Sequence, residues 1–380
     1  MKKTILLIVS VILVTGCSSL KYNKHGLYFK IPISHVIPKN NNPKILKSQS
    51  VDFEIPKSII FIIADGAGIG HYTAHYYSNQ TFSFDDFEHI GLQTTHPANQ
   101  DRIVTDSAAG GSALATGEKV ERKSVSMKND IALKSVVGWA EHFGMSTGLI
   151  TTTKVNHATP AAFGSSTNSR YNYDDIFLQL LLSDIDIILG GGTKYWNDTF
   201  VKIAKDNNAL VYFDFKDIKI DDDRVIGLFA DDFLDLKYEN RYPTTIEMTK
   251  VALEKLEQNE SGFFLMVEES QTDWAGHVNN ATYIKNEMQS LDDLVKYCLE
   301  YQSKNPEVLV VLTADHETGG IAVYDEDADN LNIQYIDSHH SANMVPIFAS
   351  GPGAEAFDAI LDNSEIGKKL IQFVRDGENE

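Results

Sequence analysis

Hydrophobic residues form continuous runs, rather than alternating with polar residues, in several parts of this chain. Residues 59–64, 263–267 and 308–312 are three such runs. Runs of this length are typical of strands that are buried on both faces of a parallel sheet. Residues 145–151 and 185–189 are predicted to form further strands, with helical segments between them. This alternation predicts a three-layer α/β/α sandwich with a central, mostly parallel sheet.

Each of the first three runs is followed by carboxylates. Asp65 follows the first run, Glu268 and Glu269 follow the second, and Asp315 lies shortly after the third. Ligands of open α/β sheets bind beyond the carboxyl ends of the strands. We therefore expect these acids to meet at one edge of the sheet, which core packing alone does not explain.

Histidines accompany the acids. His316 is adjacent to Asp315, and His277 follows Asp273 by one helical turn, so that both members of the second pair could face one ion. Zinc binds histidine nitrogen and carboxylate oxygen, and a catalytic zinc site keeps one position open. A single histidine is more often structural or exposed, but several histidines beside acids at strand ends favour a metal site.

Ser107 follows Asp106 and begins a run of small residues that ends at Gly117. A serine at the start of a helix lies where the helix amides and the positive end of the dipole favour an anion. Serine is a weak nucleophile and needs an activator, which a metal would supply. Because serine and aspartate are also ordinary N-cap residues, this segment alone fits a capped helix without catalytic function equally well.

These segments together resemble the alkaline phosphatase family. The resemblance follows the family's order from about residue 58 to the C-terminus, and it rests on residues 64–66, 105–117, 151–162, 268–277, 313–320 and 340–346. It implies the fold of that family and its activity. The activity is the hydrolysis of phosphate monoesters to an alcohol and inorganic phosphate through a phosphoserine intermediate.

The resemblance also implies a role for individual residues. Ser107 would be the nucleophile, and Arg170, which lies ten residues after Pro160, would hold the phosphate. Two Zn²⁺ ions and one Mg²⁺ ion are the implied cofactors. Their implied ligands are Asp65, Asp315 and His316 for the zinc that activates Ser107, Asp273, His277 and His340 for the second zinc, and Asp65, Thr159 and Glu268 for magnesium.

Two of these positions have a competing neighbour. Glu268 is preferred to Glu269 because the family has a five-residue gap before its first zinc aspartate. His340 is preferred to His339 because of its distance to residues 351–352. The competing neighbours are expected to be solvated or to lie beside the ligands.

His157 and Trp274 are expected beside the magnesium site. The family carries aspartate or histidine at the first position, and some members carry lysine or histidine at the second. Since imidazole attracts magnesium through its waters less strongly than a carboxylate does, we expect weak magnesium retention in this chain. The alternative is that both side chains only pack beside the site.

The first 17 residues have the features of an export signal. Two lysines precede an apolar run, residues 5–14, which is too short to span a membrane. Residues 14–17 match a bacterial lipoprotein box, so Cys17 is predicted to be lipidated and to anchor the protein to a bacterial membrane, in the periplasm or cell envelope. The alternative is a cleaved signal with an incidental cysteine. Residues 18–50 are predicted to be a tether or an irregular segment.

The chain has 380 residues, and residues 51–380 are predicted to form a single catalytic domain. A net charge of −20 makes binding to nucleic acid unfavourable. Residues 194–240 are predicted to be an irregular insertion, with acids more typical of solvated loops than of a calcium site. Cys298 lies at helical spacing from apolar residues and is predicted to be buried. The chain is short for the family, which leaves open whether it forms the usual homodimer.

Hydrolysis of small phosphate monoesters has alternatives. The nearest is a phosphodiesterase or nucleotide pyrophosphatase of the same superfamily, but Arg170 and the residues around Ser107 favour monoesters. A sulfatase is disfavoured because Ser107 lies in a Thr-Asp-Ser segment and no Cys-x-Pro-x-Arg motif occurs. The alternative from a different class is a noncatalytic lipoprotein that binds phosphate esters at the cell surface.

Overall fold

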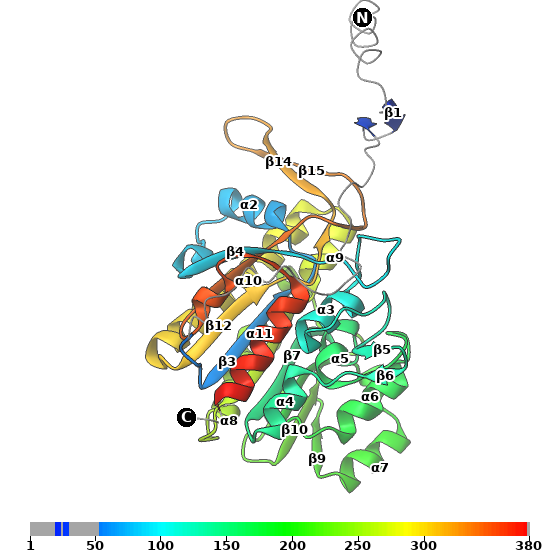
Figure 1. Ribbon diagram of the computed structural model, residues 1–380, viewed down its shortest axis with the longest axis vertical. Helices are drawn as coiled ribbons and strands as arrows, with labels where there is room; N and C mark the ends of the chain where they lie inside the picture. Colours follow the sequence, from blue (N-terminus) through cyan, green and yellow to red (C-terminus); the bar gives the residue numbers. More distant parts are fainter. Residues whose placement is uncertain (1–19, 24–25, 30–52, 378–380) are drawn as a thin grey trace, which may run out of the picture. The chain divides into compact units, whose positions relative to one another are not determined.

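The hydrophobic runs of the sequence form five adjacent strands of a ten-stranded sheet in the computed structural model (Figure 1), which describes residues 20–23, 26–29 and 53–377. Nine of the ten strands run in one direction and one, β17, runs in the opposite direction, so the prediction of a mostly parallel sheet is confirmed. From edge to edge, the strands are β18 (Ile360–Asp362), β4 (His89–Thr94), β17 (Val345–Ser350), β12 (Val308–Thr313), β3 (Ser58–Ala64), β11 (Phe263–Glu269), β7 (Ser146–Lys154), β8 (Ile187–Gly191), β10 (Arg224–Leu228) and β9 (Ala209–Tyr212).

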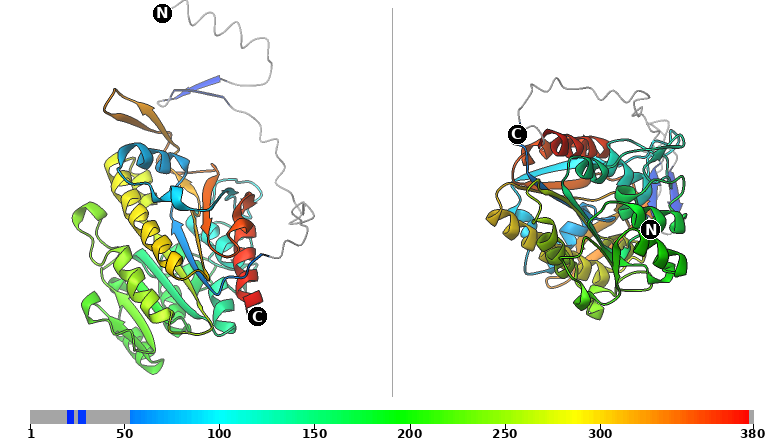
Figure 2. Two further views of the ribbon diagram at one scale, coloured as in Figure 1. Left: turned by 90° about the vertical axis from the view of Figure 1, so that its left-hand side faces the viewer. Right: turned by 90° about the horizontal axis from the view of Figure 1, so that it is seen from below.

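Helices cover both faces of the sheet, which gives the predicted three layers (Figure 2). The central strand β3 explains why its apolar run is continuous, because Ile59 and Phe61 belong to one hydrophobic core and Ile60 and Ile62 to the other. The first core also contains residues of α3 (Ser107–Thr116), α4 (Val136–His142), α5 (Ala158–Gly164), α6 (Tyr173–Leu182), α7 (Asp198–Asp206) and α11 (Asn363–Asp376). The second contains residues of α2 (Ile69–Ser78), α8 (Thr245–Leu256) and α10 (Ala281–Lys304).

The carboxyl ends of the central strands lie at one edge of the sheet. Ile63 of β3 pairs with Glu268 of β11 on one side and with Thr313 of β12 on the other. The residues that follow these three strands therefore start at the same level. The short helix α9 (Gln271–His277) follows β11, and both α9 and α3 lie near this end of the sheet (Figure 1).

The prediction of an irregular insertion over residues 194–240 is wrong. This segment contains α7, β9 and β10, and the two strands extend the sheet beyond β8. Phe200 and Ala204 of α7 reach the first core. Acidic residues in the turns between these elements hide the hydrophobic pattern, which is why the sequence suggests a loop.

The remaining elements are short. Residues 20–23 and 26–29 form an antiparallel pair, β1 and β2, within the predicted irregular segment. The rest of that segment and the predicted signal peptide with Cys17 lie outside the described residues. No helix among the described residues combines the length and hydropathy of a membrane-spanning segment. The other elements are η1 (Ser83–Asp86), β5 (Met127–Lys128), β6 (Ile131–Ala132), η2 (Thr193–Tyr195), η3 (Phe215–Asp217), η4 (Lys237–Glu239), β13 (Glu317–Thr318), β14 (Ile321–Asp325), β15 (Leu331–Tyr335), β16 (His340–Ser341) and η5 (Ala354–Phe357).

Cys298 lies in α10 as a buried free thiol, as predicted from its helical spacing. Burial raises the pKa of this thiol to about 12. A thiol that stays protonated is a packing residue and not a nucleophile.

Candidate metal centre and phosphate site

Ser107 is the first residue of α3, and Asp106 caps this helix by accepting a hydrogen bond from a backbone amide of the first turn. All ten residues of the helix are buried, and their small size lets the helix approach the loop after β12. A Cβ atom at Gly110 would lie 2.6 Å from the carbonyl oxygen of Asp315. This close packing brings Ser107 Oγ within 3.2 Å of His316 Nε2.

The structure brings Asp65, Asp315 and His316 together from the ends of β3 and β12. His316 Nε2 lies 3.4 Å from Asp65 Oδ1 and 3.3 Å from Asp315 Oδ2, and all three side chains are fully buried. Gly66 follows Asp65 with a left-handed φ of 70°, and its amide donates a hydrogen bond to Asp315 Oδ1. A Cβ atom at Gly66 would lie 2.7 Å from Asp273, so only glycine allows this approach.

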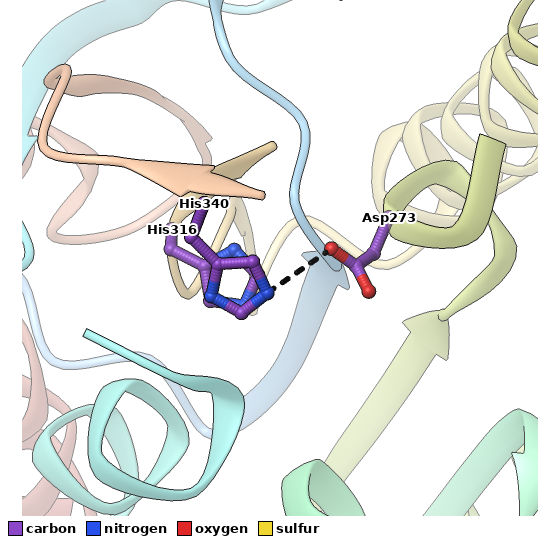
Figure 3. A group of neighbouring side chains, drawn as sticks. All are labelled: Asp273, His316 and His340. Carbon is purple, nitrogen blue, oxygen red and sulfur yellow. Dashed lines mark ion pairs between the residues drawn. The ribbon is translucent and has the colours of Figure 1, made fainter. Parts of the chain in front are cut away.

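Asp273, His277 and His340 form a second group next to the first. His277 Nε2 lies 3.3 Å from Asp273 Oδ2 and 3.2 Å from His340 Nε2. Figure 3 shows the carboxylate of Asp273 turned toward His340, with the rings of His340 and His316 face to face at a centroid distance of 3.6 Å. His316 therefore borders both groups, and its ligand atom lies within 4.8 Å of those of Asp273 and His340.

Each of these three histidines has a partner at Nδ1. The partners are Ser338 O for His277 (2.7 Å), Thr105 O for His340 (3.0 Å) and Thr318 Oγ1 for His316 (3.3 Å). A carbonyl oxygen only accepts a hydrogen bond, so Nδ1 of His277 and of His340 carries a proton. In the neutral ring this leaves the lone pair on Nε2, which faces the cluster, as in metal-binding histidines.

A third group contains Asp65, Glu268 and His157, whose ligand atoms lie within 4.8 Å of one another. The hydroxyl group of Thr159, in the first turn of α5, is fully buried. The sequence predicts His157 beside the magnesium ligands, whereas the structure brings its ring among the ligand atoms themselves. The ring of Trp274 lies 6.4 Å from that of His157, edge to face.

Several buried oxygen atoms of these groups have no hydrogen-bond partner among the described residues. They are Asp65 Oδ1 and Oδ2, Asp315 Oδ2, Glu268 Oε1 and Thr159 Oγ1. A buried oxygen without a donor is unfavourable, and more so if it carries charge. Oxygen atoms from several elements that converge without donors fit cations, and the nearby imidazoles match the preference of zinc.

The pKa values of the acids give the same indication. Burial raises the pKa of Asp65 well above its usual range, and the charges of Asp315, Asp273 and Glu268 raise it further. Burial also raises the pKa of Asp315 to about 7, and it raises that of Glu268. The described residues therefore give these carboxylates too little positive charge, and a divalent cation would supply it.

Asp273 differs from the other acids of the site. Burial by itself would raise its pKa, but the hydrogen bond that Asp273 accepts from His277 and the charge of that imidazole hold the pKa below its usual range. The same hydrogen bond raises the pKa of His277 to about 9. Burial lowers the pKa of His340, and it lowers that of His316 strongly. The two buried imidazoles thus favour the neutral form that binds metals.

Arg170 lies beside this cluster and is held from two sides. Its Nη1 lies 3.3 Å from Asp106 Oδ2, and its Nη2 lies 3.1 Å from His157 Nε2. A guanidinium group only donates hydrogen bonds, so His157 accepts here and is neutral. Burial and the charge of Arg170 lower the pKa of His157, which agrees with a neutral ring.

The two competing neighbours lie in different surroundings from the residues chosen over them. Glu269 Oε2 lies 3.2 Å from Arg241 Nη1 on the other face of the sheet. The side chain of His339 is 79% exposed, and its nearest charged partner is Asp337 at 3.9 Å. Neither residue joins the cluster of ligand atoms.

Sequence reasoning missed residues that hold the site in place. The backbone amide of Lys123 donates to both carboxylate oxygens of Asp106, at 3.2 and 3.1 Å, and its carbonyl oxygen accepts a hydrogen bond from the amide of Arg170 at 2.7 Å. Thr318 donates to Asp273 Oδ1. Lys123 acts through its backbone, so no property of its side chain could have identified it.

Comparison with known proteins gives one consistent result. A family model described as alkaline phosphatase matches residues 56–336, and a model of the prokaryotic membrane lipoprotein lipid attachment site matches residues 1–18. Alkaline phosphatase 3 of Bacillus subtilis (strain 168) is 34% identical over 339 residues, which cover 84% of this chain and 71% of that protein. Alkaline phosphatase 4 of the same organism is 36% identical over 70% of this chain, and the match covers 62% of that protein.

Solved structures agree with these relatives. The alkaline phosphatase of the Antarctic bacterium TAB5 has a TM-score of 0.79 and 31% identity, over 85% of this chain and 99% of that one. A variant of it, in which a histidine is replaced by glutamate, has a TM-score of 0.80, 31% identity and the same coverage, and it has Mg bound in a site called M3. Alkaline phosphatase from Thermus thermophilus, at 20% identity, shares the fold with a TM-score of 0.80 over 90% of this chain and 95% of that one.

Proposed function

The chain belongs to the alkaline phosphatase family and hydrolyses phosphate monoesters, and we propose that it does so through a phosphoserine formed on Ser107. One observation carries this proposal. Ser107 Oγ lies at a helix N-terminus, 3.2 Å from His316, in a cluster where several buried carboxylate oxygens have no hydrogen-bond partner among the described residues. A helix end that favours anions and a cluster that favours cations thus meet at one hydroxyl group.

Arg170 is the proposed phosphate-binding residue. Its planar guanidinium group can donate to two nonbridging oxygens of a phosphate at once. The contacts with Asp106 and His157 support this role because they fix the orientation of the guanidinium group before substrate arrives. A preset orientation is worth more in phosphoryl transfer than in most reactions, since catalysis there depends on alignment and charge.

In the proposed reaction, Ser107 Oγ attacks phosphorus and the alcohol leaves. Water then cleaves the phosphoserine and releases inorganic phosphate. The amides and dipole at the start of α3 stabilise the negative charge of the phosphoryl group at this position. Because α3 is buried along its whole length, the helix holds Oγ in place during both steps.

We propose that the cluster holds two zinc ions and one magnesium ion. Asp65, Asp315 and His316 would hold the first zinc, Asp273, His277 and His340 the second, and Asp65, Thr159 and Glu268 the magnesium. Bound zinc would lower the pKa of the serine hydroxyl and of the attacking water, and it would offset the charge of the phosphoryl group. The imidazole of His157 beside Glu268 supports the expectation of weak magnesium retention.

We further propose that the protein is exported and anchored to a bacterial membrane through a lipid on Cys17. The lipoprotein attachment motif at residues 1–18 supports this proposal. Two or more acyl chains would make the attachment stable. Expression of a Cys17→Ser variant tests it: the wild-type protein should sediment with membranes, and the variant should not be found in the membrane fraction after alkaline washing.

The phosphoserine proposal is tested with Ser107→Ala. Turnover of p-nitrophenyl phosphate should fall by about three orders of magnitude or more, with zinc content unchanged. Acid quenching with radioactive phosphate should label the wild-type protein and leave the variant unlabelled. Ser112→Ala in the same helix is the matched control and should keep activity, because the Ser112 hydroxyl bonds only within the fold, donating to the carbonyl oxygen of Ala108 and accepting from the amide of Ser126. Full activity of Ser107→Ala would remove Ser107 from the mechanism.

Two further measurements bear on the metals and on the substrate class. A chelator should abolish activity, zinc should restore most of it and magnesium should add to it. Hydrolysis of p-nitrophenyl phosphate should greatly exceed that of bis-p-nitrophenyl phosphate. The reverse order would indicate a phosphodiesterase, and resistance to chelators would contradict the metal sites.

A further inference from the structure

Phe233 is an exposed aromatic residue in a part of the chain that the mechanism does not use. Its side chain is 45% exposed, whereas its neighbour Leu234 is buried. Leu234 donates to Thr152 O at 3.0 Å and accepts from Gln271 Nε2 at 2.7 Å. These backbone bonds fix the loop from the side of β7 and from the side of α9.

The residue before Phe233 is fixed as well. The carboxylate of Asp232 lies 2.9 Å from Lys154 Nζ and 2.5 Å from Lys194 Nζ. Phe233 thus stands between two neighbours that are tied to the body of the domain. A ring that is held in place and yet faces solvent gains little for folding.

Phe233 is connected to the phosphate-binding residue through two rings. Its ring centroid lies 4.6 Å from that of Trp274, at an interplanar angle of 81°. Trp274 in turn lies 6.4 Å from His157, at 88°, and His157 contacts the guanidinium group of Arg170. A series of ring contacts therefore leads from Arg170 through His157 and Trp274 to Phe233, whose ring is exposed to solvent.

We propose that Trp274 and Phe233 form an aromatic platform that binds the leaving group, so that the enzyme prefers monoesters whose alcohol carries an aromatic ring. This inference rests on the proposed function, because the platform acts only on a substrate whose phosphate lies at Arg170. The phosphate contacts are the same for every monoester. Discrimination between monoesters therefore comes from the alcohol part, and aromatic rings contact a ring better than a polar chain.

Adenosine 5′-monophosphate and ribose 5-phosphate provide a matched pair of substrates. Both release a primary alcohol of the same sugar, and only the first carries an aromatic base. The wild-type enzyme should have a higher kcat/KM for the nucleotide. Phe233→Ala should reduce this preference about fivefold. The loss should arise from a higher KM for the nucleotide, with kcat and the values for ribose 5-phosphate unchanged.

Phe213→Ala is the matched control. Phe213 is 51% exposed and packs edge to face on Trp196 at 5.9 Å, in the same region of the chain but without a contact to the phosphate site. It should leave the preference unchanged. Phe233→Tyr keeps the ring and should restore the preference that alanine loses.

Three outcomes would overturn the platform. They are an unchanged preference in Phe233→Ala, an equal loss in Phe213→Ala, and a loss in kcat alone. Each of these leaves hydrolysis of both monoesters intact, so the proposed function would stand. If the wild-type protein hydrolysed neither compound, the proposed function would fail and the platform with it.

Discussion

Glu268 and Glu269 are neighbours on β11 and both are fully buried, yet their carboxylates have different partners. Successive residues of a strand face opposite sides of the sheet. Glu268 lies in a group with Asp65 and His157, and its Oε1 has no hydrogen-bond partner among the described residues. Glu269 lies 3.2 Å from Arg241 Nη1 and accepts a hydrogen bond from Ser290 at 2.9 Å.

In the cluster around Arg241, the chain supplies a donor to every carboxylate oxygen. Arg241 Nη2 lies 2.5 Å from Glu287 Oε2, and its Nε donates to the carbonyl oxygen of Asp235 at 2.7 Å. The backbone amide of Lys237 donates to the other oxygen of Glu287 at 2.9 Å. All three charged side chains are fully buried. Like the metal centre, this cluster contains fully buried carboxylates, but its cation comes from the chain itself.

The difference between the surroundings of Glu268 and Glu269 shows which buried acids need a cation that the chain does not supply. Burial alone does not, because both glutamates are equally buried. The deciding property is whether the fold brings a donor or a positive charge to every carboxylate oxygen. The two clusters should therefore respond in opposite ways when one negative charge is removed.

The largest effect is expected for Asp315→Asn in the metal centre. Zinc content should fall, and phosphatase activity should fall by about 100-fold or more because a charged ligand is lost. In the metal-free protein the same variant should be more stable to urea at pH 8. The reason is that the raised pKa of Asp315 makes its ionised form unfavourable in the folded state, and an amide could donate to Asp65. If the metal-free Asp315→Asn protein were less stable than the metal-free wild type, the difference between the two clusters would be refuted.

Glu269→Gln should have the opposite effect, with lower stability to urea and unchanged zinc content. It keeps the ion pair between Arg241 and Glu287. It replaces the charged oxygens of Glu269 that accept from Arg241 and Ser290 with a neutral amide, which should destabilise the protein by about 1–3 kcal/mol. Urea unfolding should show the same loss with metal and after chelation, and zinc content should not change. A loss that depended on metal would place Glu269 in the metal centre.

Glu268→Gln should have a smaller effect on activity. Stimulation by magnesium should disappear while zinc content stays normal, and activity at saturating zinc should fall about fivefold to tenfold, because magnesium prefers charged oxygen ligands. Metal analysis together with a magnesium titration measures both. Loss of zinc in this variant would show that Glu268 belongs to a zinc site.

The smallest effect is expected from Glu141, which lies near Asp184 and Asp186 and outside both clusters compared above. Burial and the charge of Asp184 raise the pKa of Glu141 to about 7, against the hydrogen bond from Thr147. A raised pKa means that the neutral form stabilises the fold at low pH, and this stability is lost as pH rises through about 7. Glu141→Gln should therefore be more stable than wild type by about 1 kcal/mol at pH 8. Thermal unfolding at pH 5 and pH 8 checks the prediction: the gain should nearly vanish at pH 5, and an equal gain at both would refute it.

The sequence predicts the layers of the fold because the evidence is local. A strand such as residues 59–64 that is buried on both faces must be apolar at every position, and this pattern can be read without any partner. Strands β9 and β10 were not predicted from the sequence, because β9 is the edge strand, β10 lies next to it, and acidic turns interrupt the hydrophobic pattern. The hydrophobic pattern is thus most informative where burial is complete.

The sequence by itself determined the chemistry of this protein: which acids, histidines and serine follow which strands, and the family that this order resembles. Only the tertiary structure decided how each charge is balanced. Arg241 forms an ion pair with Glu269. The backbone of Lys123 forms hydrogen bonds with both Asp106 and Arg170. The ring of Phe233 packs edge to face on Trp274. The physical reason is that side-chain type is a local property. A counter-charge, a backbone hydrogen bond or a ring contact comes from an element distant along the chain, and no short pattern records it.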